Sequence, residues 1–480
     1  MKIDEHIKQQ EQQPHEDNTE VTLDEPLELT FVEDADAFVQ LPMYGDVADS
    51  SSDRLRKTAI RVQDLWRCMK TKKDLLHMLN VTLAGIYGEH STMLTMNQLC
   101  RFAYTSIESK RYTTFQIPKK KGEFRTIDAP VPMLKYIQRG INFILQSVYT
   151  PNPAAMGFVQ HRSVVDNAKV HAGQRLVYNI DLKDFFPSIT SGRLLGRLMS
   201  KPFSLNKEVA SVITDLCCYT NAEGKHVLPQ GAPTSPTITN IICERLDRKL
   251  TCLAKAYGLK YTRYADDISF SGMGNVFADD SRFVKSMRNI IEQEEHFTIN
   301  PDKTRLCHQG MRQEVTGLSV NQQENVSRTY IKQLRTLLHN WEMDGYDKAQ
   351  EVFAKHYVET NTRNLRSKGT HHIENIIAGK LMYLKMVKGE TDGTYKSLAA
   401  RFKALMGGLT SQRVKESSIL PLPEGWDKNA EEGRAGQLSD LMTNTSVDNE
   451  VKDIGKVEES PDEMLMTLIM LEELLNNEND

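Results

Sequence analysis

The feature that most constrains this chain is a pair of adjacent acids, Asp266 and Asp267, between two short apolar segments. The stretch from Gly258 to Phe270 predicts two strands joined by a tight turn, because aspartate tolerates unusual backbone angles and can bond its own backbone. Neighbouring carboxylates repel each other, so the arrangement is costly unless a cation lies between them and a further ligand. The usual chemistry of such a site is phosphoryl transfer with two metal ions.

A site of this kind needs a third acid from elsewhere in the fold. Asp181 is the candidate, because it lies in an apolar, strand-like segment (residues 177–186, VYNIDLKDFF) that breaks directly after it. We predict Asp181 and Asp266 as metal ligands and Asp267 as a supporting ligand, and these three acids as the catalytic residues. Two Mg²⁺ ions are the expected cofactor, since this cation prefers hard carboxylate oxygens. An isolated Asp-Asp pair, in contrast, usually marks a solvated loop.

Charge is distributed unevenly along the chain. Residues 1–55 hold 3 basic and 15 acidic residues, and residues 421–480 hold 4 and 16, so the body between them carries a net charge of +20 although the whole chain carries −4. A basic body between acidic ends indicates a polyanionic ligand such as nucleic acid. The alternative is that the charge only serves solubility, as in basic enzymes that bind no nucleic acid.

Composition also bears on the compartment. No apolar run approaches the length of a membrane span, and the first residues, MKIDEHIKQQEQQ, do not resemble a signal peptide. The seven cysteines are an odd number and lack metal-ligand spacing, which is typical of a reducing compartment. We therefore expect a cytoplasmic protein with no membrane contact.

The apolar periodicity predicts a chain of mixed helices and strands. We expect a hairpin over residues 111–127, short strands near 300–306 and 314–320, and helices over 54–83, 96–109, 130–148, 191–199, 206–218, 237–257, 279–294 and throughout 327–408. Residues 1–55 are predicted to be mostly disordered. A capping box at Ser460 predicts a last helix, which would dock on the body or bind a partner.

Residues near the acids suggest a nucleotide pocket. Phe185 is expected in the core, whereas Phe186 is placed to lie under an incoming sugar and exclude a 2′-hydroxyl. In the Gly/Pro-rich loop Leu228–Pro236, Gly231 allows close backbone approach and Gln230 can hydrogen-bond a base or sugar. The alternative is that this loop is a plain turn.

Three basic residues are candidate triphosphate contacts. Lys121 and Arg125 belong to a basic cluster on the predicted hairpin, and Arg is the better bidentate phosphate ligand. Lys303, in an Asn-Pro-Asp-Lys-Thr segment, could protonate the leaving pyrophosphate. The alternative for each is a solvated surface charge.

In this order, the basic hairpin, NIDLKDFF, LPQGAPTSP, YADD and the Lys303 segment resemble a reverse transcriptase over about residues 55–410. The strings Asn167-Ala-Lys-Val-His171 and Val315-Thr316-Gly317 are similar to two hallmarks of bacterial retron reverse transcriptases. The resemblance implies RNA binding by Asn167, His171, Val315, Thr316 and Gly317, together with a basic helical thumb.

The resemblance also implies an α+β, right-hand polymerase fold with fingers, a palm built on an antiparallel sheet, and a helical thumb. The expected segments are an acidic extension (1–55), fingers and N-terminal helices (56–175), palm (176–325), thumb (326–410) and an acidic linker with a C-terminal helix (411–480).

The implied activity is RNA-directed DNA synthesis of retron type. Its partners would be a cognate structured noncoding RNA and its cDNA, dNTPs, and an accessory effector protein in antiphage defence. The product would be a branched RNA–DNA hybrid (msDNA). Two alternatives stay open: another bacterial defence-associated or group II intron-like reverse transcriptase, and an RNA-binding scaffold that sequesters a partner.

Overall fold

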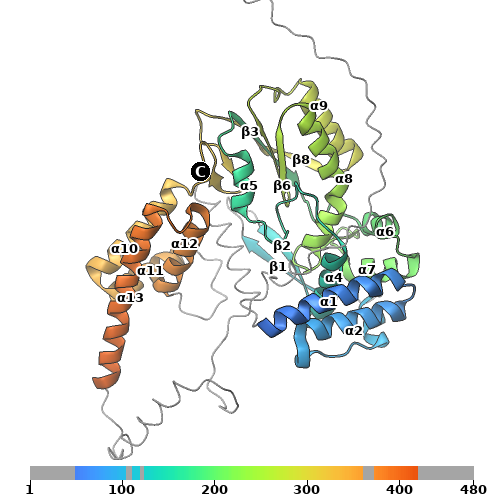
Figure 1. The fold of residues 1–480 in the computed structure, drawn as a ribbon, viewed down its shortest axis with the longest axis horizontal. Helices are drawn as coiled ribbons and strands as arrows, with labels where there is room; N and C mark the ends of the chain where they lie inside the picture. The colour runs from blue at the N-terminus through green and yellow to red at the C-terminus, as the bar shows by residue number, and fades with distance from the viewer. Residues whose placement is uncertain (1–48, 104–110, 119–123, 361–371, 420–480) are drawn as a thin grey trace, which may run out of the picture.

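The computed structural model describes residues 49–103, 111–118, 124–360 and 372–419. Residues 1–48 of the predicted acidic extension, Lys121 and the predicted C-terminal helix lie outside these residues. Residues 49–55, predicted to be mostly disordered with the rest of the extension, instead begin the first helix of the structure. The described chain is of the α+β type, with an antiparallel sheet, helices on both sides of it and a separate group of helices at its C-terminal end (Figure 1).

A four-stranded antiparallel sheet carries the predicted acids. Its strands lie in the order β6 (Lys260–Tyr264), β7 (Asp267–Gly272), β3 (Leu176–Lys183) and β8 (Thr298–His308). Successive side chains of a strand point to opposite faces. Leu176, Tyr178, Ile180 and Leu182 therefore belong to the main core, whereas Asp181 lies on the other face.

Helices cover the sheet from two sides. On the main-core side lie α8 (Ser235–Ala256) and α9 (Arg282–Arg288), which continues as the π-helical turn η5 (Asn289–Glu294). Helix α5 (Val164–His171) lies on the other side (Figure 1) and starts with a capping box in which Ser163 and Asp166 bond each other's backbone amides. The predicted helices over 237–257 and 279–294 are confirmed, the second with its π-helical end.

The N-terminal half adds a helical layer and a hairpin. The helices are α1 (Asp49–Cys68), α2 (Lys72–Tyr87), η2 (Gly88–His90), α3 (Met96–Ala103), α4 (Pro132–Val148), α6 (Ser191–Met199) and α7 (Lys207–Cys217). The predicted hairpin is confirmed as β1 (Tyr112–Pro118) paired with β2 (Phe124–Pro130). A two-residue pair, β4 (Tyr219–Thr220) and β5 (His226–Val227), precedes the Gly/Pro-rich loop.

The C-terminal helices form a group with its own apolar core. They are α10 (Arg328–Asp344), α11 (Tyr346–Thr360), α12 (Ile373–Lys388) and α13 (Gly393–Ile419), which confirms the predicted helical region. Their core includes Leu334, Trp341 and Leu381 and continues to α5 and to the hairpin of β9 (Glu314–Val315) and β10 (Leu318–Ser319). None of the helices in the described ranges combines the length and apolar character that a membrane-crossing segment needs.

Candidate active site

The three predicted acids meet at one end of the sheet. Asp181 near the end of β3 is the register partner of Asp267 at the start of β7. The amide of Leu182 donates to the carbonyl oxygen of Asp266 at 3.1 Å, which holds the turn against β3. The pairing of β3 with β8 shifts register between Asn179 and Asp181, and such irregularities often re-aim a side chain near an active site.

The turn between β6 and β7 has an unusual backbone. Ala265 has a φ of +55°, in the left-handed region that residues with a Cβ rarely adopt. The turn projects Asp266, which is half-buried, and Asp267, which is exposed. Strained residues of this kind persist only where the surrounding structure holds them, and they cluster at functional sites.

The acids raise each other's proton affinity. The pKa of Asp266 is raised mainly by loss of hydration and, to a smaller extent, by repulsion from Asp181. Loss of hydration, followed by repulsion from Asp266 and Asp181, raises the pKa of Asp267 to about 8. Because Asp267 keeps an exposed face, repulsion among the three carboxylates is the main reason that its pKa is raised. The cluster therefore favours binding of positive charge.

A lysine supplies part of that positive charge. Lys303 Nζ on β8 donates to Asp181 Oδ1 at 3.0 Å, and Asn300 Nδ2 donates to Oδ2 at 3.0 Å. Burial alone would lower the pKa of Lys303, but its bond to Asp181 and the charges of the three acids outweigh that effect and raise it. Lys303 thus lies next to the three carboxylates, which is where a proton donor for the leaving group has to lie.

The donor set fits a divalent cation of the magnesium type. Mg²⁺ is usually bound by one or two carboxylates and completes its shell with water and substrate phosphate. Within the described ranges no three carboxylate, thiol or imidazole side chains form a ready-made cage. Asp181 and Asp266 are therefore the residues that would hold such ions, with Asp267 beside them.

Two of the predicted pocket residues, Phe185 and Phe186, follow Asp181 closely in the chain. Phe185 is buried, as expected, and the half-buried ring of Phe186 lies 5.6 Å from it and 6.3 Å from the ring of Phe158, measured between ring centroids. Arg125 on β2 is half-buried, and its positive charge favours the ionised form of Asp266.

The Gly/Pro-rich loop docks onto the hairpin. Gln230 O accepts from the amide of Asp128 on β2 at 2.8 Å. A Cβ at Gly231 would lie 2.9 Å from Ile127 Cγ2, and the φ of +130° also favours glycine there. Asp128 is buried and accepts from Tyr219 Oη at 2.7 Å. The loop and the hairpin are therefore held in one arrangement.

Comparison with known proteins agrees with this geometry. Residues 117–336 match a family model described as reverse transcriptase (RNA-dependent DNA polymerase). The retron Ec86 reverse transcriptase of Escherichia coli is 34% identical over 256 residues, which cover 52% of this chain and 75% of that protein.

The chain belongs to the retron reverse transcriptase family. The retron Mx65 and Mx162 reverse transcriptases of Myxococcus xanthus are 39% and 38% identical over 48% of this chain. The matches cover 56% and 52% of those two proteins, so the chain spans about half of their length. A solved telomerase from Candida albicans has a TM-score of 0.32 at 14% identity, with 86% of each chain covered, a similarity too low to support an argument.

The two segments that resemble the retron hallmarks lie next to each other, and several of their side chains are buried. Asn167, His171 and Val315 have at most 1% of their surface exposed, so their side chains cannot contact RNA in this structure. The expectation that they bind RNA is therefore wrong for direct contact. Thr316 and Gly317 are half-buried, with φ of +46° and +78°, in a two-residue turn between β9 and β10. RNA contact by these two stays a prediction.

The buried polar groups of these segments bond one another. Thr262 Oγ1 on β6 donates to Asn167 Oδ1 at 2.6 Å, so His171 Nε2 carries the proton and donates to Thr262 Oγ1 at 2.7 Å. The other imidazole nitrogen, Nδ1, accepts from Ser271 Oγ on β7 at 2.7 Å. Asn167 Nδ2 reaches Thr316 Oγ1 at 3.4 Å. These residues fasten α5 and the β9–β10 turn to the β6–β7 hairpin that carries the acids.

Sequence reasoning missed several residues that shape the site. Asn300 bonds Asp181, Asp128 carries the loop, and Arg263 and Asp247 form a buried pair behind the turn. The spacing of Asn240, Glu244 and Asp247 places three polar side chains on one side of α8, among apolar residues such as Ile241 and Leu250, a pattern that could have indicated a buried network.

Proposed function

We propose that this protein is an RNA-directed DNA polymerase of retron type, which copies part of a cognate structured RNA into DNA by two-metal nucleotidyl transfer. The observation that carries the proposal is the pairing of Asp181 with Asp267, with Asp266 bonded to the backbone of β3. This pairing gathers three acids from distant parts of the sequence at one end of one sheet. Membership of the retron reverse transcriptase family supports the same reading.

In the proposed reaction, Asp181 and Asp266 would hold two Mg²⁺ ions at the end of the sheet. Bound there, the ions would activate the primer hydroxyl and stabilise the oxygen that leaves. Lys303 stays protonated because of its acidic neighbours, so it can donate a proton to the departing pyrophosphate. Arg125 on the hairpin would bind the triphosphate, and Lys121 is the second predicted triphosphate contact.

The substrate would be selected by shape. The ring of Phe186, which follows Asp181 closely in the chain, would exclude a ribose 2′-hydroxyl and so favour dNTPs. Gln230 and Gly231 would contact the base and sugar of the nucleotide, since their loop is fixed to the hairpin by Asp128. In right-hand terms, the hairpin belongs to the fingers, the sheet to the palm, and helices α10–α13 to the thumb.

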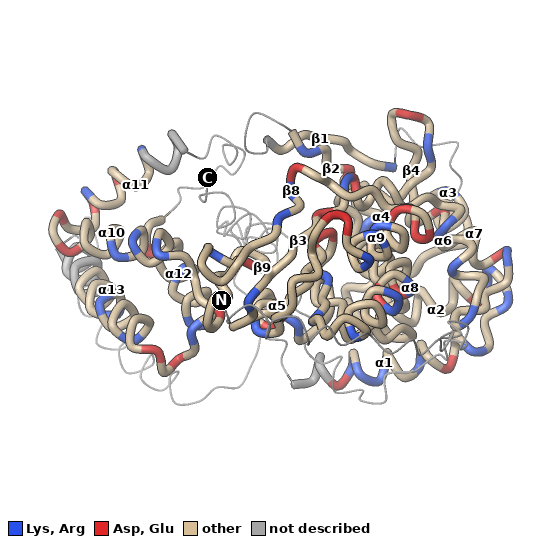
Figure 2. Tube along the Cα trace, turned by 90° about the horizontal axis from the view of Figure 1, so that it is seen from above, with Lys and Arg blue, Asp and Glu red and all other residues tan. Residues whose placement is uncertain are grey.

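The thumb helices carry exposed basic side chains for an RNA partner. Lysines and arginines recur along these helices (Figure 2), and the exposed ones include Lys332, Arg335, Lys385, Lys396 and Lys403. Duplex RNA is recognised mainly through its phosphates and 2′-hydroxyls, which a basic helical surface can follow. The expected product is the branched RNA–DNA hybrid of retrons, and the expected setting is antiphage defence with an effector protein. The seven cysteines are all unpaired, which suits the cytoplasm.

The decisive test is DNA synthesis by purified chain with the nucleic acid that co-purifies from its host. The double variant Asp266→Asn, Asp267→Asn should lower DNA synthesis by about 10³-fold while RNA affinity is retained, because the acids act on charge in the transition state. Asp280→Asn is the matched control, since that exposed acid lies outside the site.

Sequencing of the co-purifying nucleic acid separates the alternatives. A covalently branched RNA–DNA hybrid supports the retron reading, whereas unrelated bulk RNA favours a generic polymerase. Unchanged DNA yield in the double variant would refute the site assignment. RNA binding without any DNA synthesis by the wild-type chain would favour a scaffold.

A further inference from the structure

An ion pair with no exposed surface lies directly behind the turn of Ala265, Asp266 and Asp267, here called the acid turn. Arg263 on β6 donates from Nε to Asp247 Oδ1 at 2.8 Å and from Nη2 to Oδ2 at 2.7 Å. Tyr261 Oη donates to the same carboxylate at 2.7 Å. This two-pronged geometry fixes the plane and the position of the guanidinium. Because a buried pair is no general source of stability, its further hydrogen bonds indicate its role.

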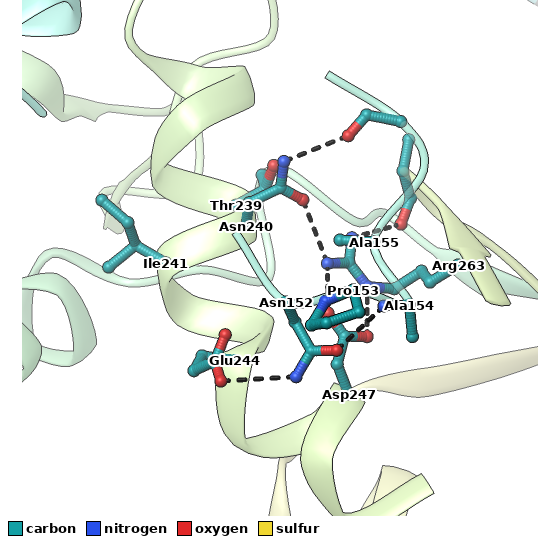
Figure 3. Close-up of polar contacts among 12 residues, drawn as sticks. Asn152, Pro153, Ala154, Ala155, Thr239, Asn240, Ile241, Glu244, Asp247 and Arg263 are labelled. Carbon is teal, nitrogen blue, oxygen red and sulfur yellow. Dashed lines mark hydrogen bonds and ion pairs between the residues drawn. The ribbon is translucent and has the colours of Figure 1, made fainter. Parts of the chain in front are cut away.

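Those hydrogen bonds reach both segments that border the site. Arg263 Nη1 donates to Ala265 O at 3.0 Å, at the left-handed residue of the acid turn. Nη2 also donates to Asn240 Oδ1 at 3.0 Å, and Asn240 Nδ2 donates to Gly157 O at 3.0 Å. Figure 3 shows Arg263 reaching toward Asp247 and Asn240 of α8, with residues 152–155 beside it. The guanidinium of Arg263 thus hydrogen-bonds the acid turn directly, and it is linked to the loop that contains Gly157 through the side-chain amide of Asn240.

The loop of residues 152–158 lies along the outer edge of β6. The amide of Arg263 donates to Ala154 O at 2.9 Å, and the amide of Met156 donates to Arg263 O at 2.7 Å. Arg162 also donates to three carbonyl oxygens of this loop, those of Asn152, Pro153 and Ala155. The loop therefore covers the free edge of the sheet and has little freedom of its own.

The loop meets the acid turn at Gly157. A Cβ added there would lie 2.5 Å from the backbone nitrogen of Ala265, so no side chain fits between loop and turn. The next residue, Phe158, has a φ of +62°, which is rare for an aromatic residue, and is 38% exposed. Its ring lies 6.3 Å from that of Phe186, the residue proposed to exclude the ribose hydroxyl.

We propose that the Arg263–Asp247 pair is a positioning device that sets the acid turn and the Phe158 loop relative to each other. It thereby fixes the place of Asp266 and Asp267 with respect to an aromatic wall formed by Phe158 and Phe186. Phe158 is a specificity-determining residue in this arrangement, because it supports the ring of Phe186. The proposal rests on the proposed polymerase function, and it assigns these residues a role beyond holding the fold.

The test separates positioning from stability. The double variant Arg263→Met, Asp247→Leu replaces the pair by apolar side chains, a change that leaves no charge buried alone and that proteins often tolerate. Lys249→Met is the matched control, because Lys249 on the same helix forms another buried pair, with Glu295 at 2.6 Å, away from the turn. Gly157→Ala disturbs the same contact without any change of charge.

Two readouts are measured on the full chain. The first is binding of Mn²⁺, a paramagnetic probe for the Mg²⁺ site, followed by electron paramagnetic resonance with Asp266→Asn as the baseline. The second is the preference for dNTPs over rNTPs. Mn²⁺ affinity should fall about tenfold in the double variant and in Gly157→Ala, as is found when supports around metal ligands are lost, and stay unchanged in Lys249→Met. Phe158→Leu should lower the preference on the order of tenfold and leave Mn²⁺ affinity unchanged.

The outcomes are distinct. A folded double variant with wild-type Mn²⁺ affinity and wild-type preference for dNTPs overturns the positioning proposal. Should the double variant fail to fold, wild-type behaviour of Gly157→Ala overturns it instead. If the wild-type chain made no DNA and bound Mn²⁺ no better than Asp266→Asn, the proposed function itself would fail.

Discussion

The buried imidazole of His171 should make the stability of this protein depend on pH in a way that one substitution removes. Burial, helped by the charge of Lys260 on β6, lowers the pKa of His171 to about 3, whereas an unfolded chain has an ordinary value of about 6.5. Its ring faces Ser271 of β7 and Thr262 of β6. Between these two pKa values the unfolded state binds more protons than the folded state, so stability is lost as the pH falls below 6.5.

The magnitude follows from these two values. At pH 5 the unfolded histidine is almost fully protonated and the folded one almost fully neutral, so this group costs about 2 kcal/mol of folding free energy relative to pH 8. An exposed histidine contributes almost nothing, since its pKa is similar in both states.

The assay is urea unfolding at pH 8 and pH 5 for the wild-type chain, His171→Gln and the control His90→Gln, which changes an exposed histidine. His171→Gln keeps a polar side chain but cannot titrate, so the loss between the two pH values should be smaller by about 2 kcal/mol than in the wild type. His90→Gln should behave like the wild type. The same pH dependence in His171→Gln and the wild type would refute the argument.

Further predictions follow from the site and its supports. Phe186→Ala should let rNTPs be incorporated while dNTP incorporation continues. Unaltered rejection of rNTPs in a primer-extension assay would contradict the proposal that Phe186 excludes the ribose 2′-hydroxyl. Asn167→Ala should lower the free energy of unfolding by about 1–3 kcal/mol, because Thr262 loses a buried partner, with RNA affinity unchanged. A loss of RNA affinity at unchanged stability, measured by filter binding and urea unfolding, would restore a direct RNA contact. EDTA should stop DNA synthesis and leave the RNA complex intact, as a gel-shift assay can show; synthesis in EDTA would exclude the proposed metal chemistry.

Much of the local structure around the acids could be predicted from the sequence. Alternating apolar residues predict strands, and an Asp-Asp pair between two of them predicts a turn, because these patterns depend on neighbours only a few residues away. Most of the helices and the β1–β2 hairpin follow from the same short-range rules, with errors at their ends, whereas the short helix α5 was not predicted. The meeting of Asp181 with the pair at 266 and 267 was predictable because phosphoryl-transfer chemistry requires it.

Other features depend on which face of an element meets which neighbour. The segment from Asn167 to His171 was expected to read RNA, but the tertiary structure turns both side chains inward onto β6 and β7. A five-residue motif cannot reveal this difference, because a buried polar network and a binding surface use the same side chains.

The sequence by itself determined the acids, the strands and turn that carry them, and the family to which the chain belongs. Only the tertiary structure decided that Arg263 bonds Asp247 and that Gly157 lies against Ala265. These contacts join residues far apart in the chain through packing and charge pairing, and no local periodicity records such partners. The positions of the acids thus follow from short-range chemistry, whereas the groups that hold them in place follow from the fold as a whole.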